Sequence, residues 1–428
     1  MENRTYDRRS VFAWAMYDFA NSAYAALVLT FIFSTYFTKA IAPNEIIGTT
    51  LWSRAITLSA LTVAVLSPFM GALADNGGLR KLFLMFFTTL SVTGTAFLYT
   101  AKAGQIYETL AIFVIANLSF EMGNVFYNAY LPDIAPPDKI GRISGYGWSF
   151  GYVGGLLAML IAMVGFVQTD TPWFGFVKDA GENIRATNLL VALWFGVFSL
   201  PIFFWVKDQQ RKSFPDAKTL FMSTYGQLKS TLSEIKRYKQ IVRLLIARVF
   251  YNDGLITIFS FGGIYASGTF GFTFQEILIF GIVLNITAGI GAFALGFLDD
   301  KIGGKKTIQI TNIGFIFATL LAVFAPNKTY FWIAGIIIGI FSGPNQAASR
   351  SLMGRFVPRD KENEFFGFYA FSGKATAFIG PLFLGILTEV FHSQRAGVAV
   401  VILLFLIGGV ILQSVNEEEG KRLQMHDF

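Results

Sequence analysis

Residues 71–81 read Gly-Ala-Leu-Ala-Asp-Asn-Gly-Gly-Leu-Arg-Lys, and residues 296–306 repeat the pattern as Gly-Phe-Leu-Asp-Asp-Lys-Ile-Gly-Gly-Lys-Lys. Each copy lies between two long apolar segments, and in each a carboxylate is followed by two glycines and a basic pair. Paired glycines allow the unusual backbone angles of a tight turn, and the basic pair favours the cytoplasmic side of a membrane. Asp75 and Asp300 are 225 residues apart (300 − 75), which indicates that the chain consists of two similar halves.

A second pair of repeated motifs supports this duplication. Pro136-Pro-Asp-Lys matches Pro358-Arg-Asp-Lys, and Gly145 matches Gly367. Both offsets are 222 residues (360 − 138 and 367 − 145). Because both pairs of loops carry basic residues, we expect the two halves to have the same orientation in the membrane.

The composition is that of a polytopic membrane protein. Of the 428 residues, 54% are hydrophobic and 14% are charged, whereas soluble domains carry about 25% charged residues. Crossing a bilayer takes about 20 largely apolar residues, and such runs follow one another along the chain. We expect about twelve spans, near residues 11–40, 48–74, 82–101, 106–131, 142–168, 187–206, 240–267, 275–298, 306–325, 329–354, 364–390 and 396–414.

These spans divide the chain into an N-terminal six-helix bundle (1–206), a linker (207–239) and a C-terminal six-helix bundle with a tail (240–428). The linker is hydrophilic and rich in Lys and Arg, and its apolar residues recur at helical spacing. They are Leu220, Tyr225, Leu228, Leu232 and Ile235. The pattern predicts an amphipathic helix on the inner leaflet. A solvated linker helix is the alternative.

The basic residues also predict the orientation of the protein. Most of them fall in the connections of one side, which contain Arg80 and Lys81, Lys139 and Arg142, Lys207 to Lys239, Lys301 to Lys306, and Arg355 to Lys361. The positive-inside rule places that side in the cytoplasm and explains the net charge of +7 without a nucleic-acid partner. The first ten residues match no cleavable signal peptide. We therefore expect an inner-membrane protein with both termini in the cytoplasm.

The repeated motif at 71–81 resembles the signature loop of the major facilitator superfamily. This resemblance implies an all-α fold of two six-helix bundles around a central cavity that opens alternately to each side, with a monomer as the default. Further motifs resemble the autophagy-related vacuolar effluxer family, also called the unknown major facilitator family, in its bacterial branch. They are Tyr17-Asp-Phe-Ala-Asn-Ser-Ala-Tyr24, Asn124-Val-Phe-Tyr-Asn-Ala-Tyr-Leu-Pro132, Tyr251-Asn-Asp-Gly-Leu-Ile-Thr257 and Phe365-Phe-Gly-Phe-Tyr-Ala-Phe-Ser-Gly-Lys374. The resemblance implies the export of amino acids.

Polar residues inside the apolar spans mark the candidate site, because intramembrane charge is costly and usually faces a cavity or a partner. In the fourth span, Asn117, Glu121, Asn124 and Asn128 share one helical face. This stripe is either a cavity wall with Glu121 as ligand or proton carrier, or a structural hydrogen-bonded stripe. In the tenth span, Gly343-Pro344 predicts a helix irregularity.

The candidate substrate-binding or coupling residues are Asp18, Asn21, Tyr24, Glu121, Asn124, Tyr127, Asn128, Arg248, Tyr251, Asn252, Asp253, Gln346, Arg350 and Lys374. The candidate cytoplasmic gate consists of Asp75, Arg80, Arg142, Asp300 and Lys306. We expect Asp75 and Asp300 to latch the cytoplasmic face rather than to touch substrate.

An amino acid zwitterion in a cavity of low dielectric constant needs a cation for its carboxylate and an acceptor for its ammonium group. The cation could be Arg248, Arg350 or Lys374, and the acceptor Glu121, Asp18 or Asp253. A carboxylate among apolar helices can exchange a proton near neutral pH, so Glu121 is the first candidate for proton coupling. A permanent ion pair between Glu121 and Arg248 or Lys374 is the alternative.

The sequence gives less support to other classes of protein, such as enzymes and nucleotide-driven pumps. We find no His-Glu-x-x-His or Asp-Asp-x-x-Asp motif and no phosphate-binding Gly-x-x-x-x-Gly-Lys-Ser/Thr loop, so neither an enzyme nor a nucleotide-driven pump is expected. The chain has no cysteine, and His392 and His426 fall in a loop and the tail, so no metal or other cofactor is expected. Three alternatives stay open: a carrier of another metabolite, a lipid-like molecule or a metal chelate; an ion channel; and a non-transporting membrane sensor.

Overall fold

The structure, a computed structural model, describes residues 7–207 and 216–422. Within these ranges the protein is all-helical and contains twelve helices or helix groups long and apolar enough to cross a membrane. The expected count of spans is confirmed. Residues 1–6, His426 and part of the linker lie outside the described ranges.

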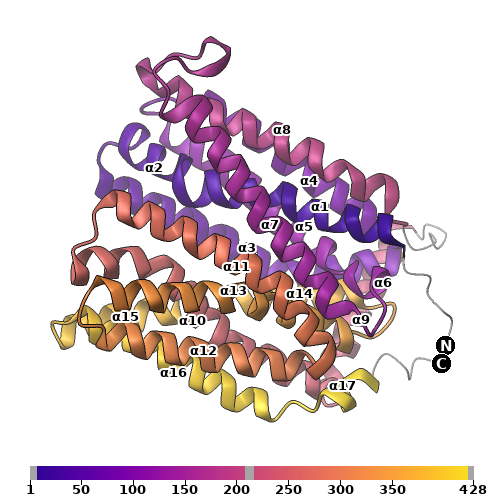
Figure 1. Ribbon diagram of the computed structural model, residues 1–428. Coiled ribbons are helices and arrows are strands. Elements are labelled where there is room, and N and C mark those ends of the chain that lie inside the picture. Colours follow the sequence, from indigo (N-terminus) through magenta and orange to yellow (C-terminus); the bar gives the residue numbers. More distant parts are fainter. Residues whose placement is uncertain (1–6, 208–215, 423–428) are drawn as a thin grey trace.

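The first half contains six spans, whose helices can be followed in Figure 1. Its helices are α1 (Arg8–Ala23), α2 (Phe33–Tyr36), α3 (Glu45–Gly77), α4 (Arg80–Phe97), α5 (Ile106–Asn128), α6 (Leu131–Ile134), α7 (Ile140–Ala162) and α8 (Glu182–Trp205). The first span is irregular, because π-helical segments, Tyr24–Phe31 and Phe37–Ile41, follow α1 and α2. Such π-helical turns are rare and occur often at functional sites.

A linker helix and the second half follow. Their helices are α9 (Ala217–Ser233), α10 (Lys239–Phe270), α11 (Phe274–Ile302), α12 (Gly304–Phe324), α13 (Lys328–Phe356), α14 (Glu362–Lys374), α15 (Ile379–Val390), α16 (Gln394–Gln413) and α17 (Glu417–Arg422). The sequence predicted a helix irregularity at Gly343-Pro344. This prediction is wrong, because α13 continues through Pro344. The break lies instead in the eleventh span, between Lys374 and Ile379.

The two glycine turns differ in detail from the expectation. Gly78 ends α3 with φ 60°, and Gly303 follows α11 with φ 90°. Only a residue without a side chain adopts such angles readily. Gly77 and Gly304 are instead helical, as the last residue of α3 and the first of α12. One glycine of each pair therefore makes the turn.

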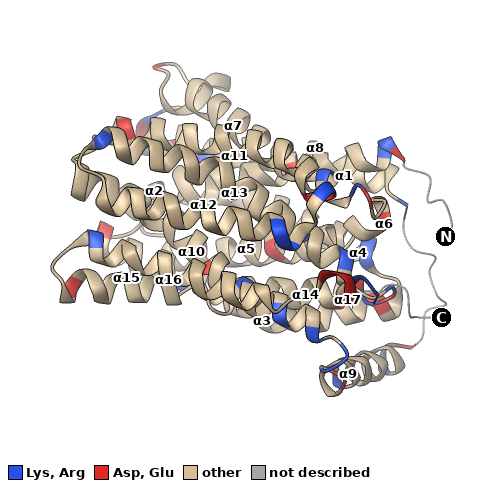
Figure 2. Cartoon of the chain, turned by 60° about the horizontal axis from the view of Figure 1, so that its bottom comes forward, with Lys and Arg blue, Asp and Glu red and all other residues tan. Residues whose placement is uncertain are grey.

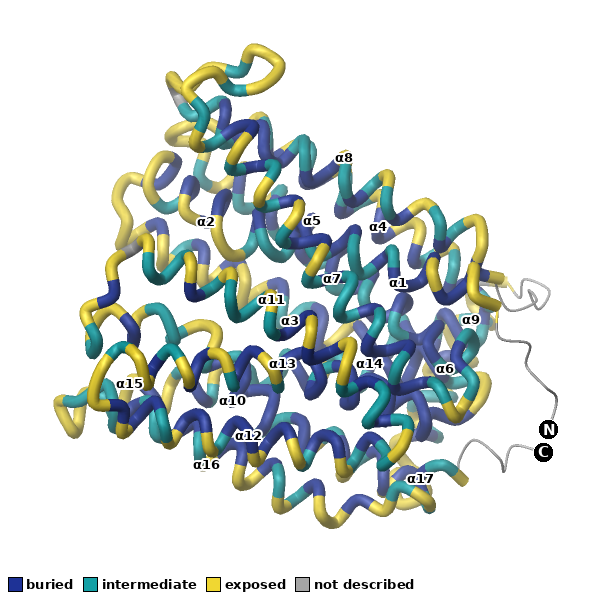
Figure 3. The backbone as a smooth tube through the Cα atoms, in the orientation of Figure 1, coloured by how far each residue is buried: buried dark blue, intermediate teal, exposed yellow. Residues whose placement is uncertain are grey.

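Both described ends of the chain, Asp7 and Arg422, lie at the same end of the bundle, called here the terminal end (Figure 1). Charged residues gather at the helix ends, chiefly at the terminal end, and long uncharged stretches separate the two ends (Figure 2). Buried positions follow the faces where helices meet (Figure 3). Many exposed side chains are large and apolar, such as Leu58, Val65, Leu193 and Phe204, as a bilayer-facing surface requires.

The two halves meet mainly through two helix pairs, and α13 of the second half also packs against α7 of the first. Helix α3 of the first half packs against α14 of the second, and α11 of the second half packs against α7 of the first. Small residues permit this approach, since a Cβ at Gly71 would lie 2.8 Å from the Cα atom of Glu364 and a Cβ at Gly296 would lie 3.0 Å from the Cα atom of Arg142. Gly71 and Gly296 are themselves 225 residues apart (296 − 71), so the duplication extends to the packing of the halves.

Candidate functional site

Arg350 of α13 reaches from the second half into the first. Its guanidinium binds Asp18 of α1 at 3.0 Å and Asn128 of α5 at 3.2 Å. It also donates to the hydroxyl and carbonyl oxygens of Ser144 on α7, at 3.0 and 2.8 Å. Arg350 is 3% exposed, so it does not extend to the membrane surface but joins the two halves inside the bundle.

The surroundings of this ion pair are adapted to it. The Arg350 guanidinium lies over the ring of Trp14, 4.6 Å from its centroid, a favourable place for a cation. A Cβ at Gly147 would lie 2.5 Å from Asp18 Oδ2 and 2.7 Å from Arg350 Nη2. Residue 147 must therefore be glycine for the pair to form in this geometry.

A second ion pair joins the halves at the helix break. Lys374 Nζ, at the end of α14, lies 2.6 Å from Glu121 Oε1 on α5. Both side chains are partly exposed, at 32% and 17%. The structure thus pairs Glu121 with Lys374, which is one of the two partners that the sequence suggested.

The other first-half candidates form a packed polar and aromatic layer. Asn21 donates to Asn124 at 2.9 Å. Tyr24 is buried and stacks on Phe120. Tyr127 is stacked between Trp14 and Tyr17, with ring centroids 4.8 and 4.7 Å away. These contacts are those of a tightly packed helix interface.

The second-half candidates on α10 contact α13, α14 and α15. Arg248 is buried, donates to the Tyr369 carbonyl at 2.9 Å and lies over the Tyr369 ring. Tyr251 shares a hydrogen bond with the Ser349 hydroxyl at 2.9 Å. Asn252 donates to the carbonyl of Gly373 at 3.4 Å.

Asp253 has a different role, because its carboxylate caps the helix that follows the break. Asp253 Oδ2 accepts a hydrogen bond from the backbone N–H of Gly380 at 2.6 Å, in the first turn of α15. That N–H has no partner within its own helix. Asp253 is 1% exposed, and its Oδ1 has no hydrogen-bond partner in the described structure.

The aspartates predicted to form the gate join the two halves at the terminal end. Asp75, near the end of α3, accepts from the backbone N–H groups of Asn363 and Glu364 at 3.2 and 2.8 Å and so caps α14. Asp300, near the end of α11, accepts from the backbone N–H groups of Gly141 and Arg142 at 2.9 and 3.3 Å, in the first turn of α7. We call these contacts the α3–α14 latch and the α7–α11 latch.

Basic residues reinforce both latches. Arg80 is 2% exposed and binds Asp133 of its own half at 2.5 Å and Glu362 of the other half at 3.4 Å. Arg142 forms an ion pair with Asp300 through its side chain. Lys306, the fifth predicted gate residue, is exposed on α12 and is not among the residues that these contacts bring together.

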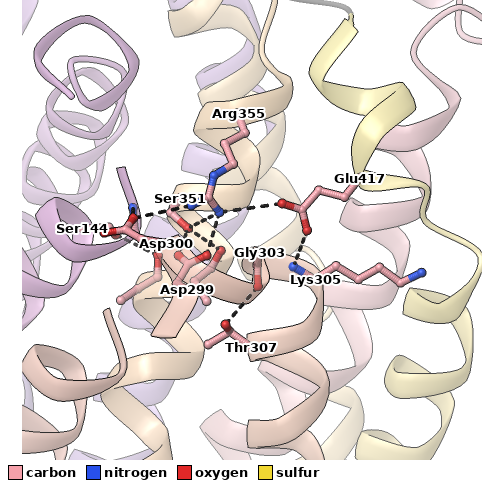
Figure 4. Close-up of polar contacts among 12 residues, drawn as sticks. Ser144, Asp299, Asp300, Gly303, Lys305, Thr307, Ser351, Arg355 and Glu417 are labelled. Atoms are coloured by element: carbon pink, nitrogen blue, oxygen red, sulfur yellow. Dashed lines mark hydrogen bonds and ion pairs between the residues drawn. The ribbon is translucent and has the colours of Figure 1, made fainter. Parts of the chain in front are cut away.

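Arg355 is the cation beside the two aspartates of α11 (Figure 4). It was not among the candidate gate residues predicted from the sequence. It binds Asp299 at 2.6 Å and approaches Asp300 at 3.8 Å and Glu417 of α17 at 4.0 Å. Ser351 also donates to Asp299. In the sequence, a basic residue near the end of a span has the pattern of a surface residue, but the adjacent acidic pair on α11 is a signal for a buried cationic partner.

The tail helix α17 is fastened to this cluster. Glu417 accepts a hydrogen bond from the backbone N–H of Lys305 at 3.1 Å, directly after the Gly303 turn. Glu419 binds Lys239 at 2.7 Å and Gln240 at 2.7 Å, and the Lys239 ammonium lowers the pKa of the exposed Glu419 carboxylate. The tail thus joins the start of α10 to the α11–α12 turn.

A cavity of about 1070 Å³ lies between the halves and extends along α10 from Leu255 to Gly268, the end of α10 away from the termini. Of the candidate residues only Gln346 lines it; Asp18, Glu121, Arg248, Asp253, Arg350 and Lys374 do not. The described lining residues include no Asp, Glu, Lys or Arg. Its members with polar side-chain atoms are Ser22, Thr30, Trp148, Tyr152, Thr257, Ser260, Tyr265, Ser267, Asn285, Thr319, Gln346 and Gln394.

Two further observations concern chemistry. Among residues 7–207 and 216–422, no group of three or more His, Asp or Glu side chains is arranged to hold a metal ion.

Residues 147–151 match Gly-x-Ser-x-Gly, the pattern of a hydrolase nucleophile. The pattern lies inside the continuous helix α7 rather than on a strand–turn–helix, so it does not have the hydrolase geometry.

Comparison with known proteins identifies relatives of this chain. The model of the family described as "Vacuole effluxer Atg22 like" matches residues 49–425. The "Uncharacterized MFS-type transporter YxiO" of Bacillus subtilis is 28% identical over 409 residues, which cover 95% of this chain and 94% of that protein. "Autophagy-related protein 22" of Kluyveromyces lactis is 25% identical, with coverage of 80% and 74%.

The fold is also found among solved structures. The major facilitator superfamily transporter FucP in the outward conformation has a TM-score of 0.77 with 13% identity, over 96% of this chain and all of that one. The expected fold class, an all-helical major facilitator fold, is therefore confirmed, and the Bacillus relative agrees with the bacterial branch.

Proposed function

Because the chain belongs to the Atg22-like vacuole effluxer family, we propose that it moves amino acids across the membrane by alternating access. The chain is a multi-pass membrane transporter rather than an enzyme, as its family and fold establish. The amino acid cargo, efflux as the direction, proton coupling and a monomeric state are parts of the proposal. The family description of an effluxer supports the direction.

In this proposal the protein lies in a bacterial inner membrane, and its terminal end faces the cytoplasm. The concentration of basic residues near that end supports this orientation (Figure 2). Both latches are then closed toward the cytoplasm, and the cavity opens toward the outside. Gate residues that hold together two rocking halves suit alternating access better than a channel.

The pair of Lys374 and Glu121 is the observation that carries the coupling proposal. It is a charge pair between the halves, partly exposed, at a break in the helix. Protonation of Glu121 removes its negative charge and weakens its attraction to Lys374. A released Lys374 can attract the carboxylate of an amino acid, so cargo and proton compete for one pair of groups.

The uncharged cavity favours a second candidate, a carrier of the same fold with an uncharged or amphipathic cargo. The lining combines hydroxyl and amide groups with aromatic and aliphatic side chains such as Trp148 and Phe261. A zwitterion in such a lining would lack charged partners. Amino acid transport therefore requires that Lys374 or Arg350 become accessible to cargo after the ion pairs open.

Counterflow in proteoliposomes tests the proposal without a driving ion. Labelled neutral amino acids and a labelled uncharged amphiphile are offered one at a time. Saturable exchange of an amino acid supports the first candidate, and exchange of the amphiphile alone supports the second. Binding without exchange by correctly folded protein would indicate a sensor. Gln346→Ala is expected to weaken exchange of whichever cargo is carried, because Gln346 lines the cavity.

A further inference from the structure

Helix α9 carries three different surfaces along its length. Side chains at intervals of three and four residues share a face of a helix. Thr224, Gln227 and Thr231 form a strip toward the bundle, and Thr224 and Thr231 are buried. Phe221, Met222, Tyr225 and Leu232 form an apolar strip that is 56–63% exposed. A third strip, of small residues, contains Ser223 and Gly226.

The strip toward the bundle holds the α3–α14 latch. Asn76, beside Asp75 on α3, donates to the Gln227 side-chain oxygen at 2.7 Å. The Gln227 amide nitrogen in turn donates to the carboxylate of Glu364, whose backbone N–H is bound by Asp75. Gln227 therefore bridges the first half to the second across the latch.

The same strip has a second attachment to the other half. Lys361, just before α14, donates to the Thr231 hydroxyl at 3.3 Å. Glu364 is fully buried, so the amide of Gln227 supplies a hydrogen bond to a carboxylate that water does not reach. Displacement of α9 would remove these contacts and weaken the closed latch.

The exposed apolar strip continues the bilayer-facing surface of α3. The Phe221 ring contacts the Phe69 ring, with centroids 5.5 Å apart. Phe69 precedes Asn76 by seven residues, which places it about 10 Å deeper along α3. Val65 and Leu66, one turn further, are exposed apolar residues of the same helix. The strip thus lies at the level where the bilayer begins.

Two lysines lie within this apolar strip. Lys218 and Lys229 are exposed and, at helical spacing, lie between Tyr225 and Met222 around the helix axis. A lysine among exposed apolar residues can keep its methylene chain beside them while its ammonium group reaches the headgroups of an anionic membrane. No neighbour lies within 4 Å of the Cβ position at Gly226, on the third strip.

We propose that α9 binds the anionic lipid surface of the inner leaflet and thereby holds the α3–α14 latch closed. The apolar strip enters the headgroup region, Lys218 and Lys229 bind lipid phosphates, and Gln227 is kept between Asn76 and Glu364. Anionic lipid then favours the state that is closed toward the cytoplasm. This inference extends beyond the cargo and does not depend on it.

The placement of α9 is tested with nitroxide labels, since the chain has no cysteine of its own. Tyr225→Cys and Ser223→Cys, both at exposed positions, are labelled in nanodiscs that contain phosphatidylglycerol. We expect the label at 225 to be accessible to oxygen and shielded from a water-soluble nickel chelate, and the label at 223 to show the reverse. Equal nickel access at both positions, or shielding of both from oxygen and nickel, would overturn the proposal in favour of a solvated helix or a protein partner.

The effect on the latch is tested with a reporter that needs no cargo. Ile140 is buried, and its side chain lies near Gly354 of the other half, so Ile140→Cys should react with a water-soluble maleimide only when the terminal end opens. In vesicles of phosphatidylcholine we expect about threefold faster labelling than with phosphatidylglycerol, the scale of one lost hydrogen bond. The double variant Lys218→Gln/Lys229→Gln should abolish the lipid effect.

Two variants control this measurement. Gln227→Ala should give fast labelling in both lipids, because the bridge is lost. Lys102→Gln removes an exposed lysine at the opposite end of the bundle and should leave the lipid effect unchanged. Labelling that is independent of lipid in the unmodified reporter would show that α9 does not act on the latch, whatever its depth in the membrane.

Discussion

Lys374 Nζ lies 2.6 Å from Glu121 Oε1, and this bond joins the two halves where the eleventh span is broken. The pair is partly exposed, so solvent weakens it. A pair of this kind can open when one partner is neutralised or when an ionic ligand competes for it. These are the properties that a coupling site requires.

Glu121→Gln is expected to abolish gradient-driven accumulation of cargo while counterflow persists within about threefold of the wild-type rate. The substitution removes the proton-binding group but keeps the size of the side chain. Accumulation and counterflow measured in the same proteoliposomes separate the two effects. Accumulation that survives unchanged would show that Glu121 is not the coupling group.

The charge-reversed double variant Glu121→Lys/Lys374→Glu is the matched control. If the pair only holds the halves together, the variant with the reversed pair should show both counterflow and accumulation. If the position of the carboxylate matters for coupling, it should show counterflow without accumulation. Lys374→Ala should weaken exchange of cargo that carries a carboxylate more than exchange of an uncharged amphiphile, and equal losses would indicate a structural role.

Asp75→Asn is expected to open the terminal end about tenfold more often, since a hydrogen bond to a charged group contributes about 1.5–3 kcal/mol. The amide of asparagine can replace one carboxylate oxygen but cannot accept from the second backbone N–H at α14. Asp300→Asn should act in the same direction, because it also breaks the ion pair with Arg142. The rate of maleimide labelling at Ile140→Cys measures both effects.

Arg355→Gln and Lys306→Gln form a second matched comparison at this end. Arg355→Gln leaves the buried Asp299 without its cation, so we expect lower stability, or rapid labelling of the reporter, or both. Lys306→Gln alters an exposed residue and should change neither quantity. A large effect of Lys306→Gln on stability or on the labelling rate would show that Lys306 does take part in the gate.

Much of the fold could be predicted from the sequence, because spans and signature loops depend on local composition. The aspartates of the gate were recognisable, since each ends a span in a repeated motif. The partners that complete the latches were not. Asn363 and Glu364 bind Asp75 through backbone groups, and backbone contacts between distant segments leave no pattern in the side chains.

The candidate site was predictable only in part, for a related reason. Intramembrane charge correctly indicated residues that are paired inside the protein, such as Asp18 with Arg350. The same criterion did not locate the cavity, whose lining is uncharged and contains residues that any apolar span could carry. Satisfied charges and an accessible binding surface are different properties, and sequence alone does not distinguish them.

Asp253→Ala is expected to lower stability by about 1 kcal/mol, the usual effect of a lost helix cap. Asp253 caps α15 across the helix break, so the first turn of α15 should loosen. Asparagine is also a good capping residue, so Asp253→Asn should keep most of the stability. Thermal unfolding in detergent measures both variants. If Asp253→Asn stays stable but loses accumulation, the charge of Asp253 takes part in coupling.

Gly71→Val is expected to keep the terminal end open. A Cβ at Gly71 would lie 2.8 Å from the Cα atom of Glu364, so a valine forces α3 and α14 apart and breaks the contacts of Asp75 with α14. Overpacking of this kind costs about 1–3 kcal/mol, which lowers the ratio of closed to open protein by about 5- to 150-fold. Labelling of Ile140→Cys should become fast and transport should stop.

Gly409→Val supplies the matched control for this prediction. It makes the same change in a membrane helix, α16, at a position where a Cβ has no neighbour within 4 Å. We expect normal labelling and normal transport, which would exclude a general effect of valine on folding. Gly296→Val, at the pseudo-equivalent contact of α11 with α7, should reproduce the effect of Gly71→Val. If neither glycine variant alters the labelling rate, the close approach of these helices is not what closes the terminal end.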